Sequence, residues 1–153
     1  MTAASFGSLF PDSFRADFSE RAIRPGSVLR IHVDTTNPPK QKRLVILAMG
    51  NDEAVVGYLF INSEINPNLF RTPALKALHL PLDKDRHGFL DHDSYLDCSK
   101  IFKVDMEQLR QAIASEPGQH IGCMDGETFE TAIGIVRAAP TISPRDKDFF
   151  AIR

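Results

Sequence analysis

Two short stretches of the sequence gather side chains that could do chemistry. The first is Lys40-Gln41-Lys42-Arg43, with three cations in four positions just before an apolar run. Lysine and arginine attract phosphate, and the arginine fork can hold it with two parallel hydrogen bonds. The second stretch runs from His87 to Asp93 and is followed by Asp97. Its histidines and aspartates are types that bind divalent metals or transfer protons near neutral pH.

Both stretches also have ordinary structural explanations. Lysine and arginine beside a buried strand are commonly solvated charges at the strand's end. His87 and His92 lie five positions apart, so an extended strand would point them to opposite faces. Their spacing matches no zinc-site pattern, and a polar turn explains the same composition. We therefore expect no metal or other cofactor, and a groove shared by His92 and Arg43 is the nearer alternative.

The composition limits the classes to which this chain can belong. Its 153 residues fit one domain, with ordinary apolar and charged fractions of 42% and 25%. A net charge of −2 means that any nucleic-acid contact must come from a local basic patch. No stretch resembles a signal peptide or a membrane span, and we expect Cys98 and Cys123 to be reduced thiols. These features predict a cytoplasmic protein that does not enter the membrane.

The centre of the chain has the patterns of β-strands. Residues 28–34 alternate apolar and polar side chains, and residues 44–49 form a continuous apolar run typical of a buried strand. Residues 35–41 contain two adjacent prolines, which indicate a loop. Further short strands are predicted at residues 55–61, 79–82, 94–97 and 101–104, with 79–82 at a sheet edge because it contains Pro81.

Helical patterns lie at the two ends. Phe10, Phe14 and Phe18 are four residues apart, which predicts a helical or flexible extension over residues 1–25. Two further helices are predicted, one after residue 105 and one capped by Asp125, and their apolar faces are Met106, Leu109, Ala112, Ile113 and Phe129, Ala132, Ile133, Val136. Residues 141–153 read as a polar tail whose Phe149-Phe150 pair would be exposed to a partner. Cys98 falls in a strand and is expected in the core, and Cys123 is expected to be structural as well.

Crowded short strands followed by helices argue for an α+β domain over residues 26–140, with a small, strongly bent sheet. Five or six short strands are too few for a sandwich, so a compact barrel is the expected closure.

The order of these elements resembles that of the MazF/PemK toxin superfamily. The resemblance rests on a Pro25-Gly26 turn before a strand, a loop, and Lys42-Arg43 at the start of a buried strand. It continues with Ile61-Asn62-Ser63 at a strand end, the segment from Ser94 to Ile101, and a final Ile121-Gly122 step between two helices. The similar region spans about residues 26–138.

This resemblance implies a small SH3-like β-barrel with short C-terminal helices and an N-terminal helical extension. It also implies a metal-independent endoribonuclease that acts on single-stranded RNA, forms a homodimer and pairs with a small antitoxin protein. By the same resemblance Arg43 and Ser63 would be catalytic, and the substrate-binding residues would be Lys40, Lys42, Asn62 and His92.

Two other functions are compatible with the sequence. The same barrel could be a non-catalytic binding module for a protein or a nucleic acid. Three features favour this alternative: the net acidity, Glu64 beside Ser63, and the Arg43-Leu44 step, where the toxins have Arg-Pro. A metal-dependent hydrolase that uses His87, His92 and Asp97 is the third alternative.

Overall fold

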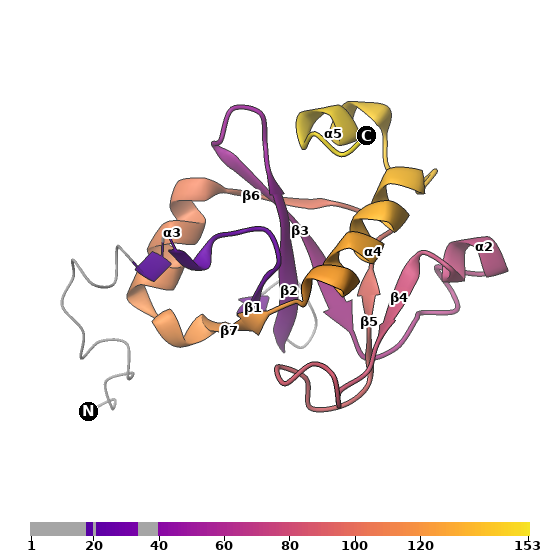
Figure 1. Cartoon of the computed structure of the whole chain (residues 1–153), viewed down its shortest axis with the longest axis horizontal. Helices are drawn as coiled ribbons and strands as arrows, with labels where there is room; N and C mark the ends of the chain where they lie inside the picture. The colour runs from indigo at the N-terminus through magenta and orange to yellow at the C-terminus, as the bar shows by residue number, and fades with distance from the viewer. Residues whose placement is uncertain (1–17, 20, 34–39) are drawn as a thin grey trace.

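The computed structural model describes residues 18–19, 21–33 and 40–153. They form an α+β fold in which helices flank a curled antiparallel sheet (Figure 1). The strands are β1 (Ser27–Val33), β2 (Lys40–Met49), β3 (Val55–Asn62), β4 (His79–Leu82), β5 (Ser94–Asp97), β6 (Phe102–Asp105) and β7 (His120–Cys123). The helices are α2 (Pro73–Lys76), α3 (Met106–Ser115), the single turn η2 (Pro117–Gln119), α4 (Gly126–Ala138) and α5 (Pro144–Phe149).

The sheet is organised around β3. Its strand order is β4-β5-β3-β2-β1-β7, and β6 pairs with the first half of β3 while β5 pairs with its end. Within the described ranges, β4 and β7 lie at the two ends of this order and do not pair with each other. The sheet is therefore a half-barrel that stays open between these two strands.

The apolar run in β2 is continuous because both faces of the sheet are covered. Leu44 and Ile46 point to one face, where they pack with Leu109 and Ile113 of α3. The alternate residues of the strand, Val45 and Leu47, belong to the second cluster, which also contains Ala132 and Val136 of α4. Period-two alternation in one strand thus supplies two cores.

The structure confirms the strands predicted in the centre of the chain. The edge position of residues 79–82 is confirmed too, since β4 lies at one end of the sheet order and Pro81 is exposed. One expectation was wrong: Lys40 and Gln41 are not loop residues, because they pair with Val33 and His32 of β1 and extend β2. Residues 34–39 lie outside the described part of the chain.

Among the elements that were not anticipated are one strand and one short helix. Strand β7 is four residues long and pairs with β1, and α2 is a single turn capped by the Thr72 side chain, which accepts from the Leu75 N–H. Both are too short to show a periodic apolar pattern.

The expected helices after residue 105 and after Asp125 are confirmed as α3 and α4, with Asp105 and Asp125 as their N-caps. Of the predicted N-terminal helix, Phe10 and Phe14 lie outside the described residues. Phe18 is helical and packs against the α3-side core.

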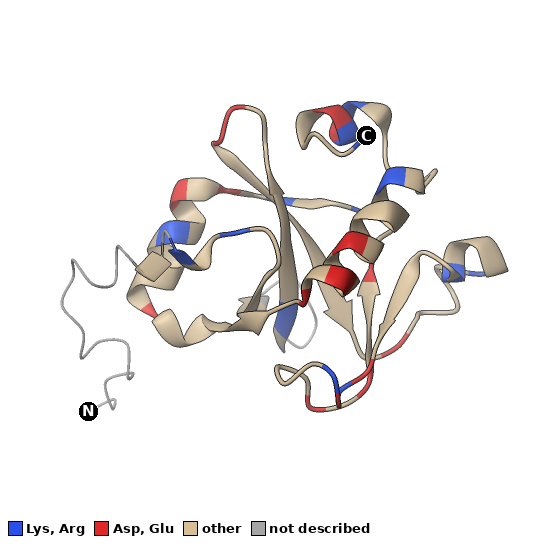
Figure 2. Ribbon diagram, viewed as in Figure 1, with Lys and Arg blue, Asp and Glu red and all other residues tan. Residues whose placement is uncertain are grey.

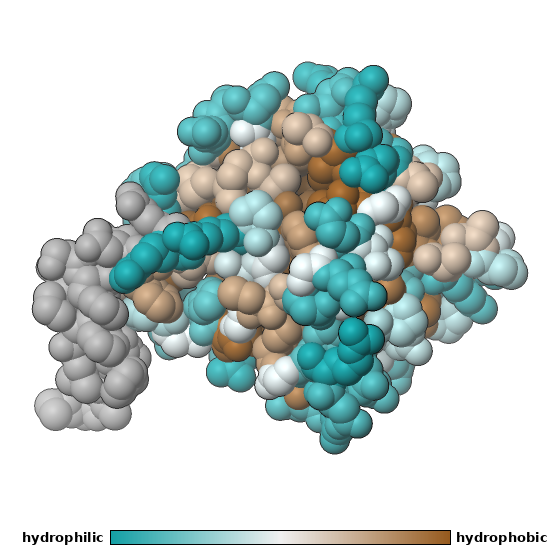
Figure 3. Space-filling model, in the orientation of Figure 1, coloured by the Kyte–Doolittle hydropathy of each residue, from teal (hydrophilic) through white to brown (hydrophobic). Residues whose placement is uncertain are grey.

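The C-terminal segment differs from its expected role as a polar tail. Residues 144–149 form α5, and Phe150 is only 3% exposed. The Phe150 ring lies against Gly57 of β3 so closely that a Cβ there would be 2.8 Å from it. The predicted exposure of the Phe149-Phe150 pair is therefore wrong for Phe150. Figure 3 shows apolar side chains gathered where α5 meets α4.

The two cysteines lie in different environments, and neither is in a disulfide. Cys98 is fully buried, as expected, and burial raises the pKa of its thiol to about 12 with a smaller contribution from Asp97. Cys123 is exposed. No helix in the described ranges is both long and apolar enough to cross a membrane.

Candidate functional site

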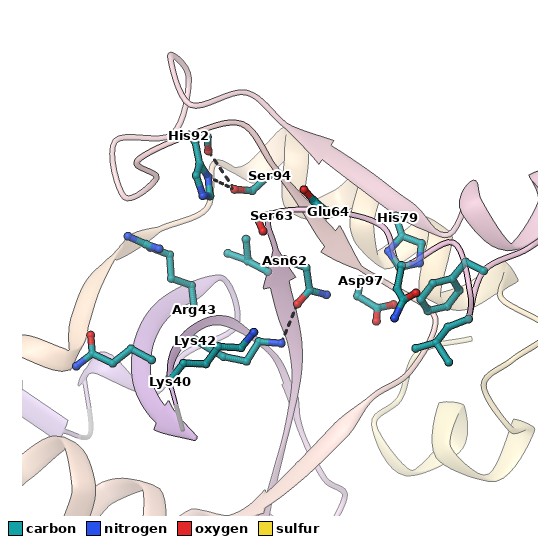
Figure 4. Close-up of a pocket in the computed structure, with 15 residues that line it drawn as sticks. Lys40, Lys42, Arg43, Asn62, Ser63, Glu64, His79, His92, Ser94 and Asp97 are labelled. Carbon is teal, nitrogen blue, oxygen red and sulfur yellow. Dashed lines mark hydrogen bonds between the residues drawn. The ribbon is translucent and has the colours of Figure 1, made fainter. Parts of the chain in front are cut away.

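A groove of about 520 Å³ lies where β2 begins and β3 ends (Figure 4). All six residues that the sequence singled out line it, namely Lys40, Lys42, Arg43, Asn62, Ser63 and His92. They come from two neighbouring strands and from the loop before β5, so the fold collects residues up to 52 positions apart. Figure 2 shows lysine and arginine in blue at the start of β2.

The pairing of β2 with β3 decides which of these residues share a face. Arg43 is opposite Ile61 in the register, and Ser63 is the first residue after the end of β3. Lys42 and Asn62 occupy the other face, where the lysine Nζ donates to the Asn62 Oδ1 at 2.8 Å. Arg43 and Ser63 nevertheless line one groove, together with Lys42.

The guanidinium of Arg43 is fixed by two acceptors. Its Nε donates to the Phe89 carbonyl at 3.0 Å, and its Nη2 donates to the Asp91 Oδ2 at 2.7 Å. The arginine side chain is 21% exposed, whereas that of Asp91 is 82% exposed. Replacing this carboxylate by another anion therefore costs little free energy, because water solvates the Asp91 side chain once it leaves the guanidinium.

Lys42 is a half-buried cation of the groove. Burial lowers the pKa of its ammonium, the positive charge of Lys40 lowers it further, and Asp97 opposes both effects. The ammonium also lies 4.5 Å from the centre of the Phe60 ring, a favourable cation–π distance. An anion in the groove would relieve the repulsion between the two lysines.

His92 and Ser94 form a local pair on the loop side of the groove. The Ser94 hydroxyl donates to the His92 carbonyl at 3.0 Å, and its oxygen lies 3.2 Å from the His92 Nδ1. Since the serine proton is already used, Nδ1 is the donor of that second contact in a neutral ring. The Nε2 lone pair is then the atom that could accept a proton.

Sequence reasoning missed the far end of the groove, where His79 and Asp97 face each other across β4 and β5. His79 is 4% exposed, and neither of its ring nitrogens has a hydrogen-bond partner among the residues that the structure describes. The ring lies edge-on to Phe70 with 4.1 Å between centroids. Burial lowers the pKa of His79, and the charge of Asp97 opposes this. Only the pairing of two short strands brings these residues together, and no local sequence motif predicts this contact.

The residues of the metal-hydrolase alternative are separated. His87 is buried with its Nδ1 3.8 Å from the Asp125 carboxylate, whereas His92 contacts Ser94. Asp97 accepts hydrogen bonds from the backbone and the hydroxyl of Ser99. In the part of the chain that the structure describes, no three His, Cys, Asp or Glu side chains gather as metal ligands.

Comparisons with known proteins add no assignment. No protein-family model matches this sequence, and no curated protein is significantly similar to it. Function must therefore be argued from the groove itself.

Proposed function

We propose that the groove binds single-stranded RNA and cleaves it as a metal-independent endoribonuclease of the MazF/PemK type. The observation that carries this proposal is that Arg43 and Ser63 line one open groove together with Lys40 and Lys42. Three cations at one site supply the positive field that the chain as a whole lacks. In this proposal the half-barrel corresponds to the small SH3-like barrel of the toxins.

The chemistry follows from the groups present. The ribose 2′-hydroxyl attacks the adjacent phosphorus and the bond to the 5′-oxygen breaks, leaving a cyclic phosphate, and a solvent water gives the departing oxygen the proton that makes it a free 5′-hydroxyl. Arg43 offsets the charge that develops on the phosphate oxygens, and the Ser63 hydroxyl donates to one of them. The Nε2 of His92 accepts the 2′-hydroxyl proton.

Asp91 holds Arg43 in place until substrate arrives. A phosphate oxygen replaces the exposed carboxylate on Nη2, while the bond from Nε to the Phe89 carbonyl keeps the guanidinium oriented. An arginine that keeps one fixed partner loses less conformational freedom on binding than a free one.

The test is cleavage of fluorescent single-stranded RNA by purified protein in the presence of EDTA. We expect activity in the wild type, and a loss of at least about 100-fold in Arg43→Ala, the size typical for one stabilising donor. Arg137→Ala, an exposed arginine at the end of α4, is the matched control and should retain full activity. Intact RNA with the wild type, over varied sequences, would rule out the nuclease.

One observation favours the non-catalytic binding module instead. Arg43 already has a carboxylate partner, and two further carboxylates, Glu64 and Asp97, line the groove. If Asp91 stays on the guanidinium, the groove can hold RNA through its lysines without stabilising a transition state. Binding without cleavage, weakened by Lys42→Ala and unchanged in Arg43→Ala, would support this alternative.

We further infer, from the same resemblance, a homodimer and a small antitoxin partner. Light scattering at micromolar concentration tests the dimer, and a mass of one chain, 17.1 kDa, would contradict it.

A further inference from the structure

The far end of the groove contains a group that the proposed cleavage does not use. His79 lies on β4 opposite Asp97 of β5, and both line the groove at the end away from Arg43 and His92 (Figure 4). Both nitrogens of the His79 ring are buried, and neither has a hydrogen-bond partner in the described part of the chain. A buried polar group in that state destabilises the folded chain, so its presence calls for an explanation.

The surroundings of His79 indicate what would complete it. Phe70 and Leu69 give this end of the groove an apolar, aromatic wall, in contrast to the cations at the other end. Asp97 uses its Oδ1 to accept from Ser99, and its Oδ2 has no hydrogen-bond partner among the described residues. A ligand that fits must therefore be planar and apolar on its face, with hydrogen-bonding groups on its edge.

We propose that His79, Asp97 and Phe70 form a nucleobase subsite that prefers uracil and guanine to cytosine and adenine. The inference rests on the proposed binding of RNA and adds the identity of the base beside the cleavage site. Single-stranded bases are recognised by aromatic stacking and by hydrogen bonds to their Watson–Crick edges.

The preference follows from donors and acceptors. Uracil and guanine carry a ring N–H next to a carbonyl, so the N–H donates to the Asp97 carboxylate and the carbonyl accepts from the His79 N–H. Cytosine and adenine present a ring nitrogen lone pair in place of that N–H. The lone pair would face the carboxylate oxygen and be repelled by it.

Entry of the base requires a local movement. The His79 nitrogens are covered in the free protein, and the Phe70 ring lies directly against the histidine. The loop that carries Phe70 also carries Leu69, whose side chain is 67% exposed, so its movement would uncover little apolar surface. The base takes the place of Phe70 beside His79, and the phenyl ring then stacks on the face of the base.

The experiment measures binding apart from cleavage. Fluorescence anisotropy with 2′-O-methyl octauridylate and octacytidylate, which lack the attacking hydroxyl, gives the two affinities directly. We expect the wild type to bind the uridine strand about tenfold more tightly, within the range for a well-formed hydrogen-bonded base contact. His79→Phe keeps an aromatic ring without nitrogens and should bind both strands equally.

His120→Phe is the matched control. His120 is a half-buried histidine that, like His79, lies beside an aromatic ring (Phe18), but it lies on β7 at the opposite end of the sheet. It should keep the uridine preference. Asp97→Asn offers a second test that does not depend on the folding of His79→Phe: its amide N–H can donate to the cytosine ring nitrogen, so the preference should shift towards cytidine.

Equal binding of the two strands by the wild type would overturn the subsite while leaving RNA binding in place. A uridine preference that survives in both His79→Phe and Asp97→Asn would overturn it as well. Failure to bind either strand would overturn both the subsite and the RNA groove.

Discussion

Arg43 shows how one side chain can be fixed and still be available. Its bond to the Phe89 carbonyl is made by Nε, on the inner side of the fork, and its bond to Asp91 is made by Nη2. The first partner is backbone and cannot leave without moving the loop. The second is an exposed side chain, so ligand binding and the Asp91 contact compete for the same donor.

Removing this competitor should strengthen RNA binding. We predict that Asp91→Asn binds single-stranded RNA severalfold more tightly, because the guanidinium no longer has to exchange one anion for another. Stability should change by less than about 1 kcal/mol, since the pair is largely solvated. Anisotropy titrations check the affinity and urea unfolding checks the stability. Asp93→Asn is the control, because Asp93 accepts from the Lys84 backbone and is not bonded to Arg43. An unchanged affinity in Asp91→Asn would mean that Asp91 is not displaced.

A second prediction at this scale concerns acid. Burial lowers the pKa of His79 below its ordinary value of 6.5, so the unfolded chain takes up a proton at a higher pH than the folded chain does. The contribution of neutral His79 to the free energy of unfolding is therefore at its full value above pH 6.5, and it decreases as the pH falls below 6.5. We expect the free energy of unfolding, measured by urea titration, to fall less between pH 7 and pH 5 in His79→Phe than in the wild type. Identical pH profiles would show that His79 titrates normally.

Helix α5 is short, and its contribution to stability comes from the residue at its C-cap. It has six residues, yet it delivers Phe150 into the core on the α4 side of the sheet. The space for that ring exists because position 57 of β3 has no side chain. A glycine in the middle of a strand often marks such a close approach.

We therefore predict that Phe150→Ala destabilises the protein by about 3–5 kcal/mol, the usual cost of truncating a buried phenylalanine. Leu69→Ala, at an exposed position, should cost less than about 0.5 kcal/mol. Urea unfolding monitored by circular dichroism gives both values. A loss below 1 kcal/mol for Phe150→Ala would show that the terminal helix is not part of the cooperative unit.

The sequence predicts the elements of this fold better than it predicts their contacts. The strands 44–49 and 55–61 are visible as mostly apolar runs because both of their faces are buried, and the two helices are visible because burial of one face imposes a period on them. The role of Phe150 is not visible, since its partner Gly57 is distant in sequence and a phenylalanine pair in a polar segment looks exposed. The meeting of His79 with Asp97 depends in the same way on the pairing of two four-residue strands. In contrast, the six residues chosen for the groove line it together, and five of them lie on or directly after β2 and β3, which are consecutive strands that pair with each other.

At the scale of the whole molecule, the local charge of the groove is opposite in sign to the net charge of the chain. The net charge is −2, while the groove has three cations at one end. RNA binding in this groove should therefore depend on salt in proportion to those three contacts alone. We predict a slope of about −2 for the logarithm of the affinity against the logarithm of salt concentration, from about 0.7 per phosphate contact on single strands. Anisotropy titrations from low to moderate salt measure it. A slope near zero would exclude phosphate contacts, and a much steeper one would locate the RNA on other cations.

The pairing of β1 with β7 joins Ser27 to Cys123, across most of the described chain. The pairing of β1 with β7 cannot form early in folding, because closing the long loop between them costs entropy before any contact compensates for it. Folding should accordingly be slow for a protein of this size, on the millisecond-to-second scale of folds dominated by non-local pairing. Until β7 pairs with it, the edge of β1 that faces away from β2 has unpaired backbone groups. In nascent or heated chains this edge can pair with another chain and so start aggregation.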